Sequence, residues 1–239
     1  MTGKRRTVAP GHAIVHDNRS GHVSYWQQEY HQSASDRTGV STADYIHVIY
    51  SFLHQAGAKD VLMIGCGGGT LATMLHRSGV AVTVVDRYRL SFDIAKGYFH
   101  MPPEIPCRVA DGLAYLKKHP VRHDALVLDA FGAEGMPEKF QTAGFFRLAK
   151  SRLKKRGGLF LMNVIVTDDD DPVPGDMEKL LKTAFGTVKL LDLPGWTDRN
   201  AVLAAGAVKN LKKPKVLMPP RPGGAKMKRE LAAMKFRKP

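Results

Sequence analysis

The sequence has few cysteines and no long apolar segment, and each shortage excludes a class of protein. Its two cysteines, Cys66 and Cys107, are too few for the disulfide framework of a small secreted domain. No run of about 18 apolar residues is present, so no membrane span is expected. The segment MTGKRRTVAPGH is charged and is not followed by the apolar part of a secretory signal. These features predict a cytoplasmic protein that makes no membrane contact.

Acidic residues are also scarce relative to basic ones, which gives the 239 residues a formal net charge of +14. The excess is concentrated in residues 209–239, which hold eleven Lys or Arg and the single acid Glu230. A basic tail attracts phosphate-rich partners, so non-specific nucleic acid contact through this tail is one interpretation. A run of this kind that also contains PPRPGG is more typical of a disordered, solvated extension.

Short apolar runs alternate with stretches of helical spacing between residues 59 and 191, a pattern typical of βαβ units around a mostly parallel sheet. With 44% hydrophobic residues, the chain is long enough to bury one sizeable core. The predicted strands are 60–64, 81–86, 105–110, 124–129, 158–165, 187–193 and 200–207, and the predicted helices are 70–78, 89–99, 112–118, 142–155 and 175–185. The last strand has no helix before it, so antiparallel pairing with its predecessor is expected. The predicted fold class is α/β, with a Rossmann-like seven-stranded sheet.

The segment before this core is predicted to be a β-hairpin followed by a helix. Residues 12–33 contain two potential strands around the turn sequence DNRSG. Residues 42–55 carry apolar side chains at helical spacing and are expected to pack on the sheet. The apolar hairpin sequence HVSYW offers an edge through which a homodimer can form.

A glycine-rich loop marks the predicted ligand site. In VLMIGCGGGTLATML, residues 61–75, a strand runs into Gly65, Gly67 and Gly69 and then into a helix. Such a loop aims backbone N–H groups at the crevice above the strand ends. The G-x-G-x-x-G dinucleotide motif would need glycine at Thr70, and no Gly-Lys-Ser/Thr of a Walker loop follows. Cys66 lies inside the loop, as a small residue in a tight turn or as a reactive thiol.

Aspartates end three successive strands beside this loop. Asp86 lies 17 residues beyond Gly69, at about the spacing at which an acid accepts hydrogen bonds from both ribose hydroxyls. Asp111 can accept from an adenine amino group, and Asp129 ends the fourth strand. Each is otherwise explained as a helix cap or an exposed loop acid. The further candidate cofactor contacts are Cys66, Arg87 and Gly112.

These motifs in this order give a family resemblance. The glycine loop, VVD, VADG, LVLDAF and MPEKFQTAGFFRLAKSRLKKRGGLFLMN resemble the Rossmann-like adenosyl-sulfonium transferases, and within them the spermidine synthase-like group, over residues 22–207. The resemblance implies S-adenosylmethionine or its decarboxylated form as cofactor. It matches Gln32 to a family glutamine near the nucleoside, and Met63 to an apolar position where typical methyltransferases have an acid. The expected division is a hairpin extension over 1–41, an adenosyl-sulfonium-binding domain over 42–208 and a disordered basic tail over 209–239.

The sequence departs from that family where cationic amines are held. The aspartate of the family's GGGDG loop corresponds to Gly68, and the second acid of its D-x-S/T-D-P segment corresponds to Gly132. Asp129 remains, at the position of the family's proton acceptor, and is the candidate catalytic residue. Without the loop acid, ordinary S-adenosylmethionine becomes acceptable, so methyl transfer to an unknown small-molecule acceptor is the preferred reaction. The alternatives are an aminopropyltransferase with an atypical amine site, and an inactive relative that binds a nucleoside or nucleic acid.

Further residues are candidates for the acceptor side of the site. The family's upstream D-E-x-x-Y-H-E segment is matched by Asp36, Tyr45 and His47 at altered spacing only. The aromatic residues that can close the site are Tyr25, Tyr30, His31 and Tyr45. The acidic run Asp168–Asp171 is interpreted as a solvated loop that can alternatively reach a cationic substrate. The ten histidines show no metal-binding spacing, so no metal is expected.

Overall fold

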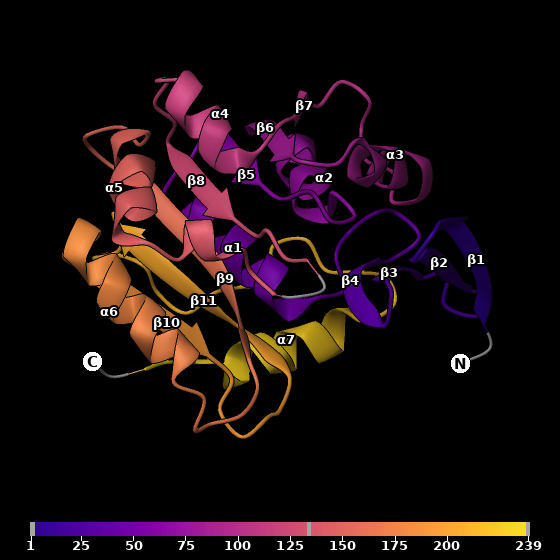
Figure 1. Cartoon of the computed structure of the whole chain (residues 1–239). Coiled ribbons are helices and arrows are strands. Elements are labelled where there is room, and N and C mark those ends of the chain that lie inside the picture. Colours follow the sequence, from indigo (N-terminus) through magenta and orange to yellow (C-terminus); the bar gives the residue numbers. More distant parts are fainter. Residues whose placement is uncertain (1–2, 133–134, 238–239) are drawn as a thin grey trace.

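Two β-sheets of unequal size organise the chain in the computed structural model, which describes residues 3–132 and 135–237 (Figure 1). The larger sheet has eight strands in the order β12-β10-β11-β9-β8-β5-β6-β7. These strands are β5 (Asp60–Ile64), β6 (Ala81–Asp86), β7 (Cys107–Val109), β8 (Ala125–Leu128), β9 (Leu159–Val166), β10 (Val188–Asp192), β11 (Arg199–Gly206) and β12 (Lys235–Phe236). Pairing from β9 to β7 is parallel, whereas β11 is antiparallel to both β9 and β10. The α/β class, the seven predicted strands and the antiparallel last strand are confirmed.

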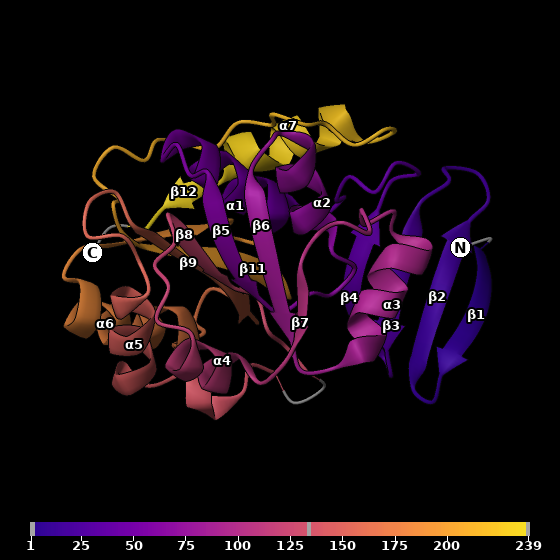
Figure 2. The same cartoon turned by 90° about the horizontal axis from the view of Figure 1, so that it is seen from above.

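Helices cover both faces of this sheet (Figure 2). They are α1 (Asp44–Gln55), α2 (Thr70–Arg77), α3 (Arg89–Tyr98), α4 (Gly112–Lys118), α5 (Ala143–Ser151), α6 (Val173–Phe185) and α7 (Gly224–Ala233), with a 3₁₀ turn at Glu138–Phe140. Helices α1, α2 and α7 pack on one face, and α4, α5 and α6 pack on the other. No helix in the described part of the chain is long and apolar enough to cross a bilayer.

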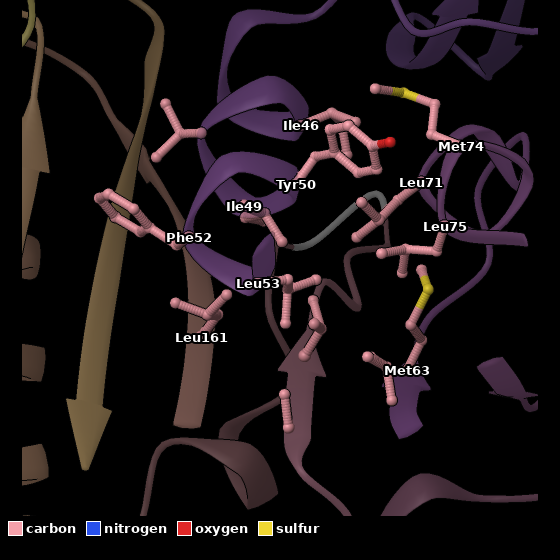
Figure 3. Close-up of a cluster of buried hydrophobic side chains, with 14 of the residues drawn as sticks. Ile46, Ile49, Tyr50, Phe52, Leu53, Met63, Leu71, Met74, Leu75 and Leu161 are labelled. Atoms are coloured by element: carbon pink, nitrogen blue, oxygen red, sulfur yellow. The ribbon is translucent and has the colours of Figure 1, made fainter. Parts of the chain in front are cut away.

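Apolar side chains at helical spacing explain the packing of α1 and α2. Figure 3 shows Ile49 and Leu53 of α1 gathered with Leu71 and Leu75 of α2 and with Met63 of β5. All five side chains are almost completely buried. Burial of each contributes about 1.5–3 kcal/mol. The packing fixes the strand-to-helix loop between β5 and α2, which is the glycine loop.

The amino-terminal segment is larger than the predicted hairpin. It is a four-stranded antiparallel sheet of β1 (Gly3–Ala9), β2 (His12–Asp17), β3 (Val23–Gln27) and β4 (Tyr30–Ser35). The hairpin of β2 and β3 is present, but the prediction missed both flanking strands. Strand β1 is mostly exposed and β4 is largely polar, so neither shows the apolar alternation by which strands are recognised. Ile14 and Tyr25 of this sheet pack against Ile94 and Phe99 at helix α3.

The carboxyl-terminal segment is folded, so the prediction of a disordered tail is wrong for the described residues 209–237. Helix α7 packs on α1, and β12 pairs with β10. Met227, Leu231 and Met234 are buried in the same core cluster as α1 and α2. Their spacing places them on one face of the helix and its end, and the basic residues occupy the exposed face.

A half-buried aspartate at the contact between α1 and α7, Asp44, gives a stability prediction. Burial and then the nearby Glu230 raise the pKa of Asp44 to about 6, although the backbone N–H of Tyr45 and the charge of Lys226 oppose the shift. The folded state therefore binds the proton more tightly than the unfolded chain, so stability falls as the pH rises from about 4 through 6. The substitution Asp44→Asn is expected to raise the unfolding free energy at pH 7 by about 1–3 kcal/mol.

Urea unfolding at pH 7 and pH 4 measures this effect, and the gain should disappear at pH 4, where Asp44 itself is protonated. Asp93→Asn on the exposed side of α3 is the matched control and should change little at either pH. An Asp44→Asn variant that is no more stable than the parent at pH 7 would contradict the expected cost of this half-buried carboxylate.

Candidate functional site

A cavity of about 890 Å³ lies at the carboxyl edge of the parallel strands. Its floor is formed by residues at the ends of β5, β6, β8 and β9, and the amino-terminal sheet forms a side wall through β2, β3 and β4. The cavity brings together nearly all of the predicted site residues: Gln32, Gly65, Cys66, Gly67, Asp86, Arg87, Asp111, Gly112 and Asp129. The exception is Gly69.

The glycine loop is shaped by close packing as well as by the cavity. Gly65 has φ +99°, and a Cβ there would lie 2.0 Å from the carbonyl oxygen of Asp129. A Cβ on Gly67 would approach the Ser33 hydroxyl to 3.0 Å, and the Gly68 N–H donates to that hydroxyl at 2.9 Å. Gly69 instead packs against Met101. Its predicted contact with the cofactor is therefore not supported, and the backbone freedom of glycine serves the turn into α2 at this position.

Position 68, which corresponds to an aspartate in the family that the sequence resembles, faces away from the cavity. A Cβ on Gly68 would lie 2.8 Å from the ring of Phe99, which is completely buried. Gly68 itself does not line the cavity. The space for a side chain at this position is thus filled by Phe99, and the loop residues that do line the cavity carry no carboxylate.

Cys66 serves the loop through its backbone. Its N–H donates to Oδ2 of Asp86 at 3.0 Å, which ties the loop to the end of β6. Burial, and then the charge of Asp86, raise the pKa of the Cys66 thiol well above its usual value. A thiol with a raised pKa is a poor nucleophile, so the structure favours the small-residue interpretation over a reactive thiol.

Asp86 is positioned on the cavity wall by two backbone donors. Its Oδ1 accepts from the N–H of Tyr88 at 2.9 Å, and its Oδ2 accepts from Cys66. Burial raises its pKa, although these donors oppose the shift. Each carboxylate oxygen has a second lone pair, so both remain able to accept a hydrogen bond from a ligand. Arg87 follows on the same wall with its guanidinium 5.0 Å from the ring of Tyr88.

Asp111 has the helix-capping role that was its alternative explanation. Its Oδ1 accepts from the N–H of Ala114 at 3.0 Å, which caps α4, and its Oδ2 pairs with the ammonium group of Lys139. Burial alone would raise its pKa, but Lys139 and the Ala114 N–H lower it. An adenine bound here would therefore meet a carboxylate whose two oxygens already accept hydrogen bonds from Ala114 and Lys139. Beside it, a Cβ on Gly112 would lie 2.5 Å from Ile64, so only glycine fits that position.

Asp129 forms a polar cluster with side chains from two other elements. Its Oδ1 accepts from the amide of Asn163 at 2.9 Å, and its Oδ2 accepts from the hydroxyl of Tyr45 at 3.2 Å. Burial raises the pKa of Asp129, whereas Asn163 and Tyr45 lower it. Burial and the charge of Asp129 raise the pKa of Tyr45 well above its usual value, so the hydroxyl stays protonated. Within the described chain, the buried Oδ1 of Asn163 has no hydrogen-bond partner.

The remaining candidates divide into cavity residues and structural residues. Tyr25, Tyr30, His31, Tyr45 and Gly132 line the cavity. The other upstream candidates and the acidic run do not line it, and most of their side chains have contacts elsewhere. Asp36 accepts from Thr38 and from the Arg221 N–H, His47 contacts the Ser41 carbonyl oxygen, Asp169 contacts Gly195 and Arg199, and Asp171 accepts from the Thr167 and Val173 N–H groups.

The sequence analysis missed several polar residues of the cavity, among them Glu138, Lys139 and Asn163. Asn163 had a signal, because it is the only polar residue in the otherwise apolar strand LFLMNVIV, and buried polar groups in such strands need a reason. Glu138 and Lys139 lie on the short 3₁₀ turn after β8, which has no sequence feature that separates it from an ordinary loop. No group of three or more His, Cys, Asp and Glu side chains is arranged for a metal ion in residues 3–132 and 135–237.

Similar proteins of known sequence support the resemblance. A probable polyamine aminopropyl transferase of Bifidobacterium longum is 26% identical over 147 residues, which cover 59% of this chain and 33% of that protein. A polyamine aminopropyltransferase of Thermococcus onnurineus is 31% identical over 108 residues, covering 41% of this chain and 38% of that protein. The matches thus span between a third and two fifths of these relatives. No established family profile matches the chain.

Solved structures share the fold. A probable spermidine synthase from Corynebacterium glutamicum superposes with a TM-score of 0.77 at 16% identity, over 100% of this chain and 91% of that one. Human methyltransferase-like protein 13 in complex with SAH gives a TM-score of 0.55 at 19% identity, over 79% of this chain and 87% of that one. The resemblance of the chain to the spermidine synthase-like group of Rossmann-like transferases is confirmed.

Proposed function

We propose that the chain is an S-adenosylmethionine-dependent transferase that moves a methyl group to a nitrogen atom of a small acceptor. The observation that supports this most directly is the placement of Asp86 and of the Asp129 cluster in one cavity, on either side of the glycine loop. Asp86 can accept hydrogen bonds from the hydroxyls of a nucleoside, and Asp129 can accept a hydrogen bond from a group that bears N–H bonds. The names of the relatives, which are aminopropyltransferases and methyltransferases, agree with a transferase of this kind.

The cofactor would lie along the strand ends from Asp111 to the glycine loop. Asp86 would accept from the two ribose hydroxyls with its free lone pairs, and Asp111 together with Lys139 would lie near the adenine edge. The backbone at Gly65 and Gly67 would lie beside the methionyl part, because only glycine permits so close an approach. When bound, S-adenosylmethionine supplies a methyl group that its sulfonium charge makes reactive.

Charge at the loop favours the intact cofactor over its decarboxylated form. Decarboxylated S-adenosylmethionine ends in an ammonium group without a neighbouring carboxylate, and such a group needs an acid partner when it is partly desolvated. The loop offers none, since position 68 is glycine packed on Phe99. The intact cofactor carries its own carboxylate, and Gln32, which lines the cavity beside Gly67, can donate to it through its amide.

The Asp129 cluster would position the acceptor and take its proton. An acceptor N–H can donate to Asp129, whose carboxylate is held in place by the amide of Asn163 and the hydroxyl of Tyr45. With the cofactor bound, an acceptor nitrogen would displace the sulfur at the methyl carbon, the electrons of the carbon–sulfur bond would go to sulfur, and Asp129 would take the proton that the nitrogen loses. Since methyl transfer depends mainly on alignment of the nucleophile with the S–CH₃ bond, little further catalytic equipment is required.

Aminopropyl transfer is the second candidate, because Glu138 also lines the cavity. This carboxylate can replace one of the acids lost at positions 68 and 132, and the aminopropyltransferase relatives favour that reaction. It lies after β8 and not on the glycine loop, so it is placed for an amine acceptor better than for the end of the cofactor. We therefore rank methyl transfer first.

Calorimetry with both cofactors tests the proposal. The chain is expected to bind S-adenosylmethionine at least about 10-fold more tightly than its decarboxylated form, since one buried amine–carboxylate pairing is worth about 2–5 kcal/mol. Asp86→Asn should weaken both by about 10- to 100-fold, as two charge-assisted hydrogen bonds are weakened. The exposed Asp93→Asn serves as control and should leave both affinities unchanged. Preference for the decarboxylated form would favour aminopropyl transfer, and binding of neither would indicate an inactive relative.

A further inference from the structure

A second cavity lies at the amino edge of the parallel strands, opposite the cofactor cavity. It has a volume of about 580 Å³ and is formed where α5 ends, β9 begins and β11 ends. Five cationic side chains line it: Arg122, Arg147, Lys150, Lys154 and Lys155. No carboxylate among the described residues lines it. The transferase proposal gives this cavity no role.

Most of this positive charge has no anionic partner. Lys154 pairs with Asp124 at 2.6 Å. Lys150 donates to the carbonyl oxygen of Ala184 at 2.7 Å, which leaves its charge in place. Arg122, Arg147 and Lys155 are exposed, and none forms an ion pair with another part of the chain that the structure describes. Like charges held so close repel one another, and an anion in the cavity would relieve that repulsion.

The positive charge extends beyond the cavity along the same edge. Parallel strands begin at this edge and the helices between them return to it, which places further basic residues of the protein body there: Lys59, Lys117, Lys118 and Arg156. The acids beside the cavity are already engaged, since Asp60 contacts His123 and Asp124 contacts Lys154, and Glu104, farther along this edge before β7, contacts His76. Asp124 also accepts from the Lys59 N–H. A row of charge longer than the cavity fits an extended polyanion better than a single small anion.

We propose that this amino edge, defined by Arg122, Arg147, Lys150, Lys154 and Lys155, binds the phosphodiester backbone of a nucleic acid. Arginine and lysine are the usual partners of backbone phosphates, and such contacts position a polymer without reading its sequence. The edge is formed by the body of the protein and not by the basic carboxyl-terminal segment. Because it lies opposite Asp129, a bound strand holds the protein in place and is not itself the methyl acceptor.

Fluorescence anisotropy with a labelled 20-nucleotide single-stranded RNA of mixed sequence tests this site on the full chain. About five phosphate contacts predict that Kd rises about 100-fold between 50 and 200 mM salt. The triple substitution Arg122→Gln, Arg147→Gln and Lys155→Gln is expected to raise Kd at 50 mM salt at least about 10-fold. The control, Lys215→Gln, Lys228→Gln and Arg229→Gln, removes the same charge from the carboxyl-terminal segment and should raise Kd less than about 3-fold.

Competitors and a folding check decide between the possible ligands. Displacement by unlabelled RNA and by long-chain polyphosphate, but not by polyglutamate at equal charge, supports a phosphate polymer. Displacement by inorganic pyrophosphate as effective as by RNA would overturn the proposal in favour of a small phosphorylated ligand. Polyglutamate as effective as RNA would overturn it in favour of an acidic polypeptide, and equal losses in the two triple variants would overturn the assignment to this edge. Both variants must keep the parent's thermal midpoint and its affinity for S-adenosylmethionine, which separates this result from the transferase proposal.

Discussion

Replacing Asp129 by asparagine is expected to lower kcat by about 10²- to 10⁴-fold, the range associated with the loss of a general base. Asparagine keeps the shape of the side chain but cannot take the proton of the acceptor nitrogen. The affinity for S-adenosylmethionine should change little, because Asp86 and the glycine loop carry that interaction in the proposed site. Single-turnover assays measure the transfer step, and calorimetry measures the cofactor affinity of the same variant.

The pH profile separates a proton acceptor from a residue that only supports the fold. Burial raises the pKa of Asp129, and the base acts in its deprotonated form, so kcat/KM should rise with pH through that raised pKa. Tyr45 lowers the pKa by donating a hydrogen bond. Tyr45→Phe should therefore move the acid limb of the profile to higher pH. An Asp129→Asn variant with parental kcat, or a Tyr45→Phe profile that does not move, would show that Asp129 is not the base.

The carboxyl-edge aspartates were predictable because their positions follow from strand ends alone. An apolar run followed by an acid fixes where Asp86, Asp111 and Asp129 lie, and a parallel sheet brings such ends to one edge. The structure places all three on one cavity. Their partners were not predictable in this way, since Lys139 reaches Asp111 and Tyr45 reaches Asp129 from distant parts of the sequence. Contacts of that kind depend on tertiary packing.

The packing around position 68 also could not be predicted from the sequence. The sequence shows that an acid of the family it resembles is missing, but not what occupies the space of that side chain. In the fold, the ring of Phe99 lies 2.8 Å from where a Cβ would be. Restoring the family's aspartate would thus require Phe99 to move, and a single substitution at position 68 does not recreate the family's loop. Asn163, by contrast, is visible in the sequence as the one polar residue of its strand.

In the carboxyl-terminal segment, composition and periodicity favour opposite structures. Eleven basic residues and a PPRPGG sequence are typical of disorder, yet Met227, Leu231 and Met234 recur at helical spacing. A helix with one apolar face and a basic exposed face has both properties. Strands β1 and β4, by contrast, have no apolar periodicity from which they could be predicted. Strand β1 is mostly exposed, and β4 is largely polar.

Truncating Leu231 to alanine is expected to lower the free energy of unfolding by about 2–5 kcal/mol, the cost of removing a buried leucine side chain from a packed core. Leu231 is 1% exposed and packs with the cluster that includes α1 and α2. Its truncation would therefore leave an empty space between α7 and the body of the protein. Leu217→Ala is the matched control, because Leu217 belongs to the same segment and is 48% exposed. It should change stability by less than about 0.5 kcal/mol. Urea unfolding monitored by circular dichroism compares the two variants, and equal stability of both with the parent would mean that the segment does not pack on the body in solution. A disordered tail predicts that equality, whereas a folded α7 predicts a loss confined to Leu231.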